Sequence, residues 1–144
     1  MSKIFIQIAS YRDPQLLPTI KDCIANAKHP ENLRFCIGWQ HSVEDTWDTL
    51  DEFKDDPRFI ILDVPHIQTR GVCWMRSEIQ KRWNGEAYTL QLDSHHRFAK
   101  NWDTTLIKML KDLQKAGHKK PLLTAYIPSF NPANDPAERA QEPW

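Results

Sequence analysis

This sequence contains little cysteine, no excess of either charge and no long apolar run. Its three cysteines, Cys23, Cys36 and Cys73, form no Cys-x-x-Cys pair, and the pattern predicts small buried hydrophobic side chains in a reducing compartment. Lysine plus arginine equals aspartate plus glutamate at 19 each, which argues against a broad nucleic-acid surface. No segment approaches the ~20 apolar residues of a membrane span, and the first ten residues resemble a strand rather than a signal peptide. We therefore expect a cytoplasmic protein without nucleic-acid partners.

What is present is the composition of one ordinary globular domain. The chain has 144 residues, of which 40% are hydrophobic and 26% charged, enough for a single domain with its own core. The last residues differ: 129–144 are rich in proline and show no periodicity. We expect a ligand-binding α/β domain at residues 1–128 and an irregular tail at 129–144.

Apolar strands and helical patterns alternate along the chain. Five short apolar runs predict strands at residues 4–9, 32–40, 58–64, 86–92 and 121–127. Helices are predicted to begin near Gln15 to Pro18 and to cover 43–53, 72–83 and 102–116, the last with Asn101 as N-cap. The apolar stripes of the last two helices are Val72, Met75, Ile79 and Trp83, then Leu106, Met109, Leu110 and Leu113. This alternation predicts an α/β fold with a mainly parallel central sheet and helices on both faces.

Polar loops follow four of the predicted strands, at residues 10–14, 39–42, 65–71 and 93–98. The carboxyl ends of parallel strands meet at one edge of a sheet, and ligands bind there near a topological switch point. We therefore expect these loops to form one rim that carries the functional residues.

The clearest chemical signal on this rim is Asp93-Ser94-His95-His96 at the end of a strand. A carboxylate and an imidazole that are separated by one residue, as Asp93 and His95 are, can bind the same divalent ion, such as Mn, Zn or Fe. Since adjacent residues of an extended segment point in opposite directions, His96 is not expected to join His95 on the ion. The alternative is a solvated turn in which Asp93 caps the next segment.

Two further groups accompany this turn. Arg70, Gly71 and Arg76 lie at the start of a predicted helix, where backbone N–H groups favour anions; taken singly, both arginines also fit a solvated surface. At the end of the first predicted strand, the aromatic ring of Tyr11 and the carboxylate of Asp13 could hold a nucleotide base. The candidate ligand-binding residues of these two strand ends are Tyr11, Arg12, Asp13 and, at the end of the second strand, Gln40.

Three blocks of sequence carry a resemblance to a known family. "IASYRDPQLLPTIKDCIANAKHPENL", "TRGVCWMRSEIQ" and "YTLQLDSHHRFAKNWD" resemble the N-terminal half of the polypeptide N-acetylglucosaminyltransferase family. "LDSHHRF" followed by "NWD" is also similar to the Asp-x-His region of the mucin-type polypeptide N-acetylgalactosaminyltransferases. The resemblance covers roughly residues 3 to 128.

The resemblance implies a GT-A nucleotide-sugar fold, Mn²⁺ or Mg²⁺, and retaining transfer of a sugar such as N-acetylglucosamine from a UDP-sugar to a protein or glycan hydroxyl. It implies that Asp93 and His95 bind the metal and that Ser94 lies near the donor. The residues it places beside the diphosphate and the uridine are Arg70, Gly71, Arg76, Tyr11 and Asp13.

The resemblance also implies a third metal ligand and an acceptor-binding part later in the chain than Trp144, so we expect donor binding with poor transfer by these 144 residues. Two alternatives remain. One is a non-catalytic nucleotide-sugar-binding module. The other, more distant, is a nucleotidyltransferase, which normally shows a glycine-rich loop after the first strand where this chain has "SYRDPQLLP".

Overall fold

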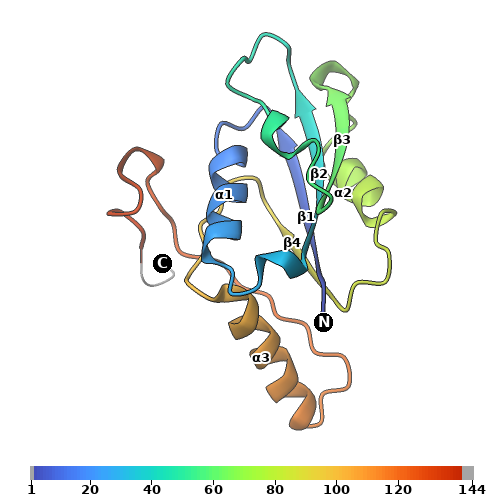
Figure 1. The fold of residues 1–144 in the computed structure, drawn as a ribbon, viewed down its shortest axis with the longest axis vertical. Coiled ribbons are helices and arrows are strands. Elements are labelled where there is room, and N and C mark those ends of the chain that lie inside the picture. Colours follow the sequence, from blue (N-terminus) through green and yellow to red (C-terminus); the bar gives the residue numbers. More distant parts are fainter. Residues whose placement is uncertain (1, 141–144) are drawn as a thin grey trace.

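The computed structural model describes residues 2–140, and these form a parallel four-stranded sheet with helices on both faces (Figure 1). The strands are β1 (Ile4–Tyr11), β2 (Leu33–His41), β3 (Phe59–Pro65) and β4 (Tyr88–Leu92), in the order β3-β2-β1-β4. The helices are α1 (Leu16–Asn26), α2 (Val72–Gln80) and α3 (Trp102–Lys115). All three strand pairings are parallel, so the expected α/β fold is confirmed.

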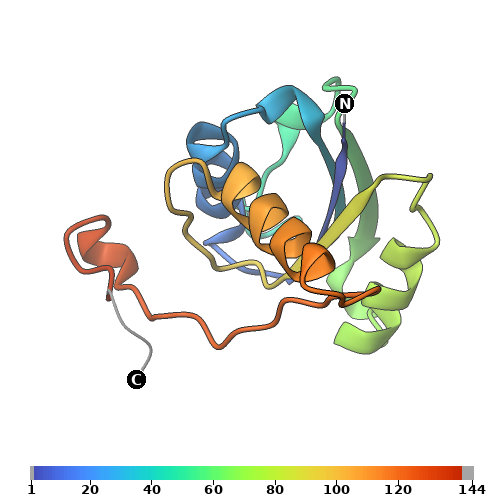
Figure 2. The same ribbon diagram turned by 90° about the horizontal axis from the view of Figure 1, so that it is seen from below.

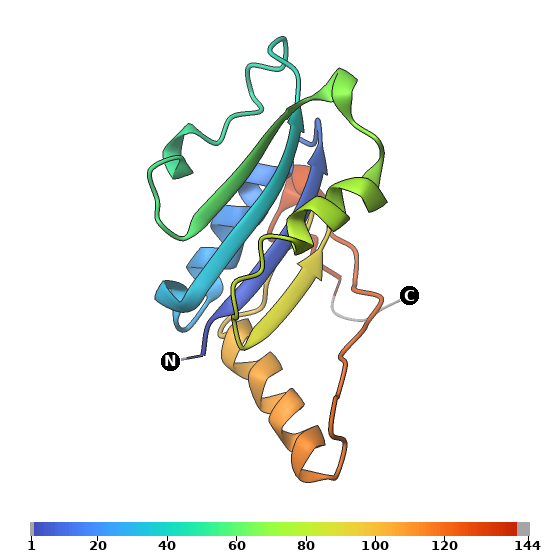
Figure 3. The ribbon, with the colours of Figure 1, turned by 90° about the vertical axis from the view of Figure 1, so that its right-hand side faces the viewer.

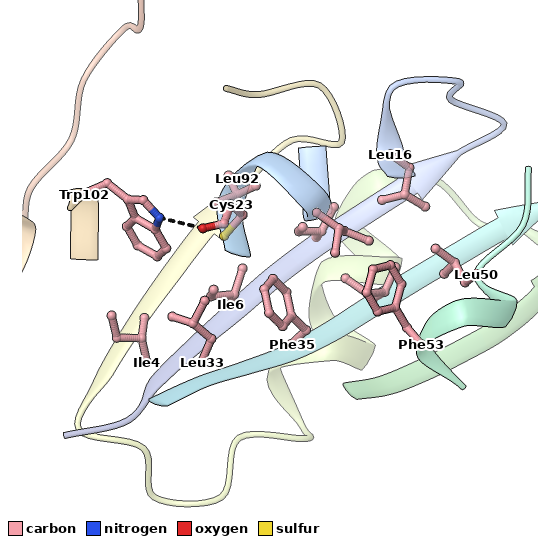
Figure 4. Close-up of a cluster of buried hydrophobic side chains, with 13 residues drawn as sticks. Ile4, Ile6, Leu16, Cys23, Leu33, Phe35, Leu50, Phe53, Leu92 and Trp102 are labelled. Atoms are coloured by element: carbon pink, nitrogen blue, oxygen red, sulfur yellow. Dashed lines mark hydrogen bonds between the residues drawn. The ribbon is translucent and has the colours of Figure 1, made fainter. Parts of the chain in front are cut away.

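The two faces of the sheet bury different side chains. Because side chains alternate along a strand, β1 directs Ile4, Ile6 and Ile8 towards α1 and Phe5 towards α2. Figure 3 shows α2 in front of the sheet and α1 behind it. The larger cluster, on the α1 face, also receives Trp102, whose Nε1–H donates to the Cys23 carbonyl over 2.9 Å (Figure 4). This bond attaches the start of α3 to α1.

Gly38 allows α2 to lie close against β2. A Cβ at this position would lie 2.3 Å from both Cγ and Sδ of Met75 and 3.1 Å from Cδ1 of Ile79. Both side chains are buried against the sheet. The small residue in the middle of β2 therefore determines how closely α2 approaches, and with it the place where α2 begins at the rim.

Two predicted elements are wrong. Residues 43–53 form turns and a single 3₁₀ turn (Asp51–Phe53) instead of a helix, because Asp48 accepts a hydrogen bond from Trp39 Nε1 and Asp45 pairs with Arg12. Residues 121–127 pair with no strand. The segment joins neither open edge of the sheet, that of β3 or that of β4, and Leu122 is 84% exposed, so local β-propensity alone does not form a strand here.

Several residues that the helical patterns place inside lie at the surface. Of the residues predicted to form the inner stripes of the helices, Val72, Trp83 and Met109 are exposed, and Trp83 lies beyond the end of α2. Cys73, predicted to be buried, is exposed as well. Cys23 and Cys36 are buried as expected, and burial raises the pKa of both thiols, that of Cys36 to about 11. Asn101 occupies the N-cap of α3, but its side chain makes no capping bond and its φ of 59° is left-handed.

After α3 the chain turns back past the sheet and leads to a small loop at one side of the molecule (Figure 2). Phe130 and Arg139 form an isolated antiparallel bridge. Asp135 accepts from Arg97 at 2.7 Å and from Arg139 at 2.5 Å, and Arg139 also reaches Asp22 of α1 at 3.2 Å. Ion pairs therefore hold the irregular tail, as far as residue 140, against α1 and the turn after β4. No helix among residues 2–140 has the length and apolar character needed to cross a membrane.

Candidate functional site

The strand order places the loops after β1 and β4 on either side of a switch point. From β1 the chain continues to β2 and β3 on one side, and β4 then pairs with the other edge of β1. The strand order therefore reverses between β1 and β4. In open parallel sheets ligands bind near such a reversal, beyond the carboxyl ends of the strands. The predicted rim of functional loops lies here.

The carboxylate of Asp13 joins these two loops. Its Oδ1 accepts the backbone N–H of Gln15 at 2.8 Å, and its Oδ2 accepts Ser94 Oγ–H at 2.6 Å and His95 Nδ1 at 2.9 Å. Burial alone would raise the pKa of Asp13, but the hydrogen bonds from Ser94, Gln15 and His95 outweigh it and hold the pKa below its ordinary value. Asp13 therefore remains an ionised acceptor.

This arrangement determines which nitrogen of His95 is available. An ionised carboxylate can only accept, so Nδ1 of His95 carries the hydrogen that Asp13 receives. In the neutral ring Nε2 then keeps its lone pair. The His95 side chain is 59% exposed, so this nitrogen is open to a ligand. A carboxylate behind an imidazole is the usual support for a histidine that binds a metal.

Asp93, the other predicted metal ligand, is paired with α2. Its Oδ1 accepts from Arg76 Nη2 at 2.9 Å, and its side chain is 54% exposed. Arg76 Nε, by contrast, is buried without a hydrogen-bond partner among the described residues. The structure thus brings Arg76 and Asp93 together as expected for one rim, and leaves one buried donor of this arginine unsatisfied.

His96 contacts the backbone of its own turn, unlike His95, which contacts Asp13. Its Nε2 accepts the backbone N–H of Asp93 at 3.0 Å, so the lone pair of that nitrogen is already used. Burial is the main cause that lowers the pKa of His96, and the neutral ring it favours is the form that can accept. Thr19 of α1 holds the same turn, because its hydroxyl donates to the Ser94 carbonyl at 2.9 Å and accepts from His96 N–H at 3.0 Å.

The start of α2 supplies a positive corner. Gly71 has a φ of 92° and open space where a Cβ would lie, a conformation that favours glycine. Arg70 is exposed, and within residues 2–140 its guanidinium makes no hydrogen bond or ion pair. A left-handed glycine, the Arg70 guanidinium and the N-terminus of α2 thus lie together, and the anion site that they would form stays a prediction.

The remaining candidates occupy the other side of the rim. Arg12 forms a two-point ion pair with Asp45, at 2.5 and 2.9 Å. Gln40 is buried, donating to the Ser10 carbonyl at 3.0 Å and accepting from the Thr69 hydroxyl, so its amide supports neighbouring loops. Tyr11 is 52% exposed, with its ring edge-on to His66 at 6.5 Å between centroids. Of these, Tyr11 presents the freest surface.

The residues that sequence reasoning missed are those that hold the candidates in place, Thr19, Asp45 and Thr69. Each is a short polar side chain among many similar ones in the sequence. Only Thr19 has a signal in the sequence, because it lies three residues after Leu16 and four before Cys23, on the apolar side of a predicted helix. In the structure its side chain is completely buried. A buried hydroxyl needs a hydrogen-bond partner, and here the partner lies 75 residues away.

The donor set fits a divalent ion in part. Asp93 and His95 offer one oxygen and one nitrogen, which suit Mn²⁺ or Zn²⁺. Among residues 2–140 no group of three or more His, Cys, Asp or Glu is arranged to hold a metal ion. Any ion bound here takes its remaining ligands from water, substrate or chain outside this group.

The class of protein that these elements define is an α/β fold with an open, all-parallel sheet. The family model described as glycosyltransferase (GlcNAc) matches residues 3–60 and 56–143, and the chain belongs to that family. It is thus a member of a family of enzymes that transfer a sugar from a donor to an acceptor. No curated protein matches this sequence.

Proposed function

We propose that this chain binds a UDP-sugar at the switch-point rim, with N-acetylglucosamine as the sugar, and transfers it with retention to a hydroxyl of a protein or glycan. Mn²⁺, or Mg²⁺ in its place, assists the reaction. The proposal includes a cytoplasmic location and a relation of the Asp93-x-His95 turn to that of the polypeptide N-acetylgalactosaminyltransferases. The residues that would contact donor or metal are Tyr11, Arg70, Gly71, Arg76, Asp93, Ser94 and His95.

The observation that carries the proposal is the hydrogen bond between Asp13 Oδ2 and His95 Nδ1, 2.9 Å long. It joins the loops after β1 and β4 and uses Nδ1 of the exposed His95 ring, which leaves Nε2 as the nitrogen that a ligand can contact. The exposed Asp93 carboxylate belongs to the same short turn. Two oriented metal donors at the crevice of a glycosyltransferase-family domain support a metal–diphosphate site.

The charges around this turn suit the chemistry. When bound, a divalent ion offsets the negative charge that develops on a departing nucleoside diphosphate. Arg70 and Arg76 add positive charge beside it, and the N-terminus of α2 adds the partial charge of its free N–H groups. Thr19 and Asp13 hold the turn rigidly, so the donors are already oriented when the ligand arrives.

Calorimetry with UDP and Mn²⁺ tests this function. We expect UDP to bind with Mn²⁺ and much more weakly after chelation. His95→Ala should lower the affinity by more than about tenfold, because a metal ligand is lost. His96→Ala should lower it less, because His96 only supports the Asp93 backbone.

Circular dichroism and thermal unfolding of both variants provide the control for folding. Equal UDP affinity with and without metal would contradict the proposed function. So would equal losses in His95→Ala and His96→Ala when both variants remain folded. A donor-hydrolysis assay with UDP-N-acetylglucosamine separates the two readings, because an enzyme hydrolyses the bound donor and a binding module does not.

A further inference from the structure

A cavity lies at the opposite end of the sheet from the rim described above. Its volume is about 410 Å³, within the usual range for sites that bind small molecules. It is lined by the amino-terminal ends of the strands and by the segment that leads into β4, and its polar lining includes Lys3, Arg34, Arg58, Arg82 and Glu86. The eight residues of β1 separate it from the rim by roughly 20 Å.

The cavity exists because α2 is short. Arg34 shares the α2-facing side of β2 with Cys36 and Gly38, since alternate residues share a face. α2 ends at Gln80, after covering Gly38 through Met75, and leaves the position of Arg34 without a helix above it. Inner strands of parallel sheets are normally apolar on both faces, so an arginine at this position is unusual.

Four cations, Lys3, Arg34, Arg58 and Arg82, line this cavity against one carboxylate, Glu86, and the nearby Asp56 and Glu78 also attract Arg34 and Arg82. Arg34 Nη1 donates only to the backbone carbonyls of Glu31 and Leu33, at 2.9 and 2.6 Å. Within residues 2–140 the Arg82 guanidinium and the Lys3 ammonium make no hydrogen bond or ion pair. Arg58 is the exception, because Asp56 holds it at 2.6 Å.

We propose that this cavity is a second binding site that takes a phosphate group, free or carried by a small organic molecule, between Arg34 and Arg82. Guanidinium groups match phosphate oxygens in geometry and charge, and Lys3 adds a third cation. The exposed Ile60 side chain forms an apolar part of the wall, where the organic part of a phosphate ester would lie. This site is independent of the proposed donor site.

Titration of the full chain with inorganic phosphate and with glucose 6-phosphate, without divalent metal, tests the proposal. Calorimetry should show binding that weakens as salt rises, and the backbone amide signals of Arg34 and Asn84 should shift in NMR spectra. Tighter binding of glucose 6-phosphate would assign an ester as the ligand, whereas equal affinities would assign free phosphate.

Variants locate the bound phosphate. Arg82→Gln should weaken binding by at least about tenfold, since a charged hydrogen bond is lost. Lys111→Gln, an exposed control on α3, and Asp93→Asn, at the other rim, should leave the affinity unchanged. Arg34→Gln should repeat the effect of Arg82→Gln.

Three results would overturn the proposal. The first is no binding of either phosphate at millimolar concentration. The second is a loss of binding in Arg70→Gln, at the switch-point rim, but not in Arg82→Gln, which would place the phosphate at that rim. The third is equal or tighter binding of malonate, which would show a carboxylate site. Because Arg70→Gln and Arg82→Gln separate the two ends of the sheet, failure here leaves the proposed donor site standing.

Discussion

Asp13→Asn tests whether one carboxylate orients the predicted metal-binding histidine. The substitution removes the charge and nearly preserves the size. In the variant the asparagine Oδ1 can still accept the Gln15 N–H, which lies 2.8 Å from Asp13 Oδ1 in the wild type. The Ser94 hydroxyl, which donates to Asp13 Oδ2 over 2.6 Å, can rotate and accept a hydrogen from the asparagine amide instead. His95 Nδ1–H, at 2.9 Å, would face an amide N–H and lose its acceptor.

The size of the effect follows from these contacts. One hydrogen bond to a charged group contributes about 1.5–3 kcal/mol. Because His95 is 59% exposed, water replaces part of that bond, and we expect Asp13→Asn to lower the free energy of unfolding by about 1 kcal/mol. Removing the partner of a metal-binding histidine typically costs 10–100-fold in affinity, or roughly 1.4–2.7 kcal/mol. The loss in Mn²⁺–UDP affinity should therefore exceed the loss in stability.

Calorimetry of Mn²⁺–UDP binding and urea unfolding measure the two quantities. Asp63→Asn is the matched control, because Asp63 contacts His41 at 2.7 Å in an exposed pair that is not proposed to bind metal. Long-range ¹⁵N NMR spectra should show His95 protonated at Nδ1 in the wild type and a mixture of tautomers in Asp13→Asn. Unchanged Mn²⁺–UDP affinity in a folded Asp13→Asn variant would show that Asp13 orients no metal ligand.

Three other predictions concern the packing that holds the site. Gly38→Ala should lower the free energy of unfolding by about 1–3 kcal/mol in urea titrations, because its Cβ would overlap Met75; unchanged stability would mean that α2 shifts freely. Thr19→Val should lower it by about 1–3 kcal/mol and weaken Mn²⁺–UDP binding, since the hydroxyl holds the turn after β4; an effect on neither would contradict that role. The ion pairs hold the pKa of Asp135 at about 2, below its ordinary 3.8, so the stability it contributes is present above about pH 4 and is lost as the pH falls towards 2. The difference in melting temperature between wild type and Asp135→Asn should therefore shrink over that range, and a constant difference would refute the ion-pair account.

The sequence alone was sufficient for the parts of the fold that depend on local patterning. Apolar runs predict the parallel strands, and the observed bounds of β1 to β4 agree closely. The inner strands β1 and β2 are buried as expected, whereas the edge strands β3 and β4 are partly exposed. Gly71 and the periodic Met75 and Ile79 locate the start and the inner face of α2. The pattern failed at residues 43–53, where hydrogen bonds to Trp39 and Arg12 hold turns instead of a helix. It also failed at 121–127, whose β-propensity is not realised because the segment joins neither open edge of the sheet.

For the site, sequence patterns predict which loops share the rim, because every parallel strand delivers its carboxyl end to the same edge. They do not predict which loops touch. Asp13 and His95 are 82 residues apart, and they meet only because β4 pairs with β1 rather than with β3. That choice of strand order belongs to the packing of the whole sheet. It brings Asp13, a candidate ligand-binding residue, into contact with His95, and it gave His96 the backbone of Asp93 as its partner.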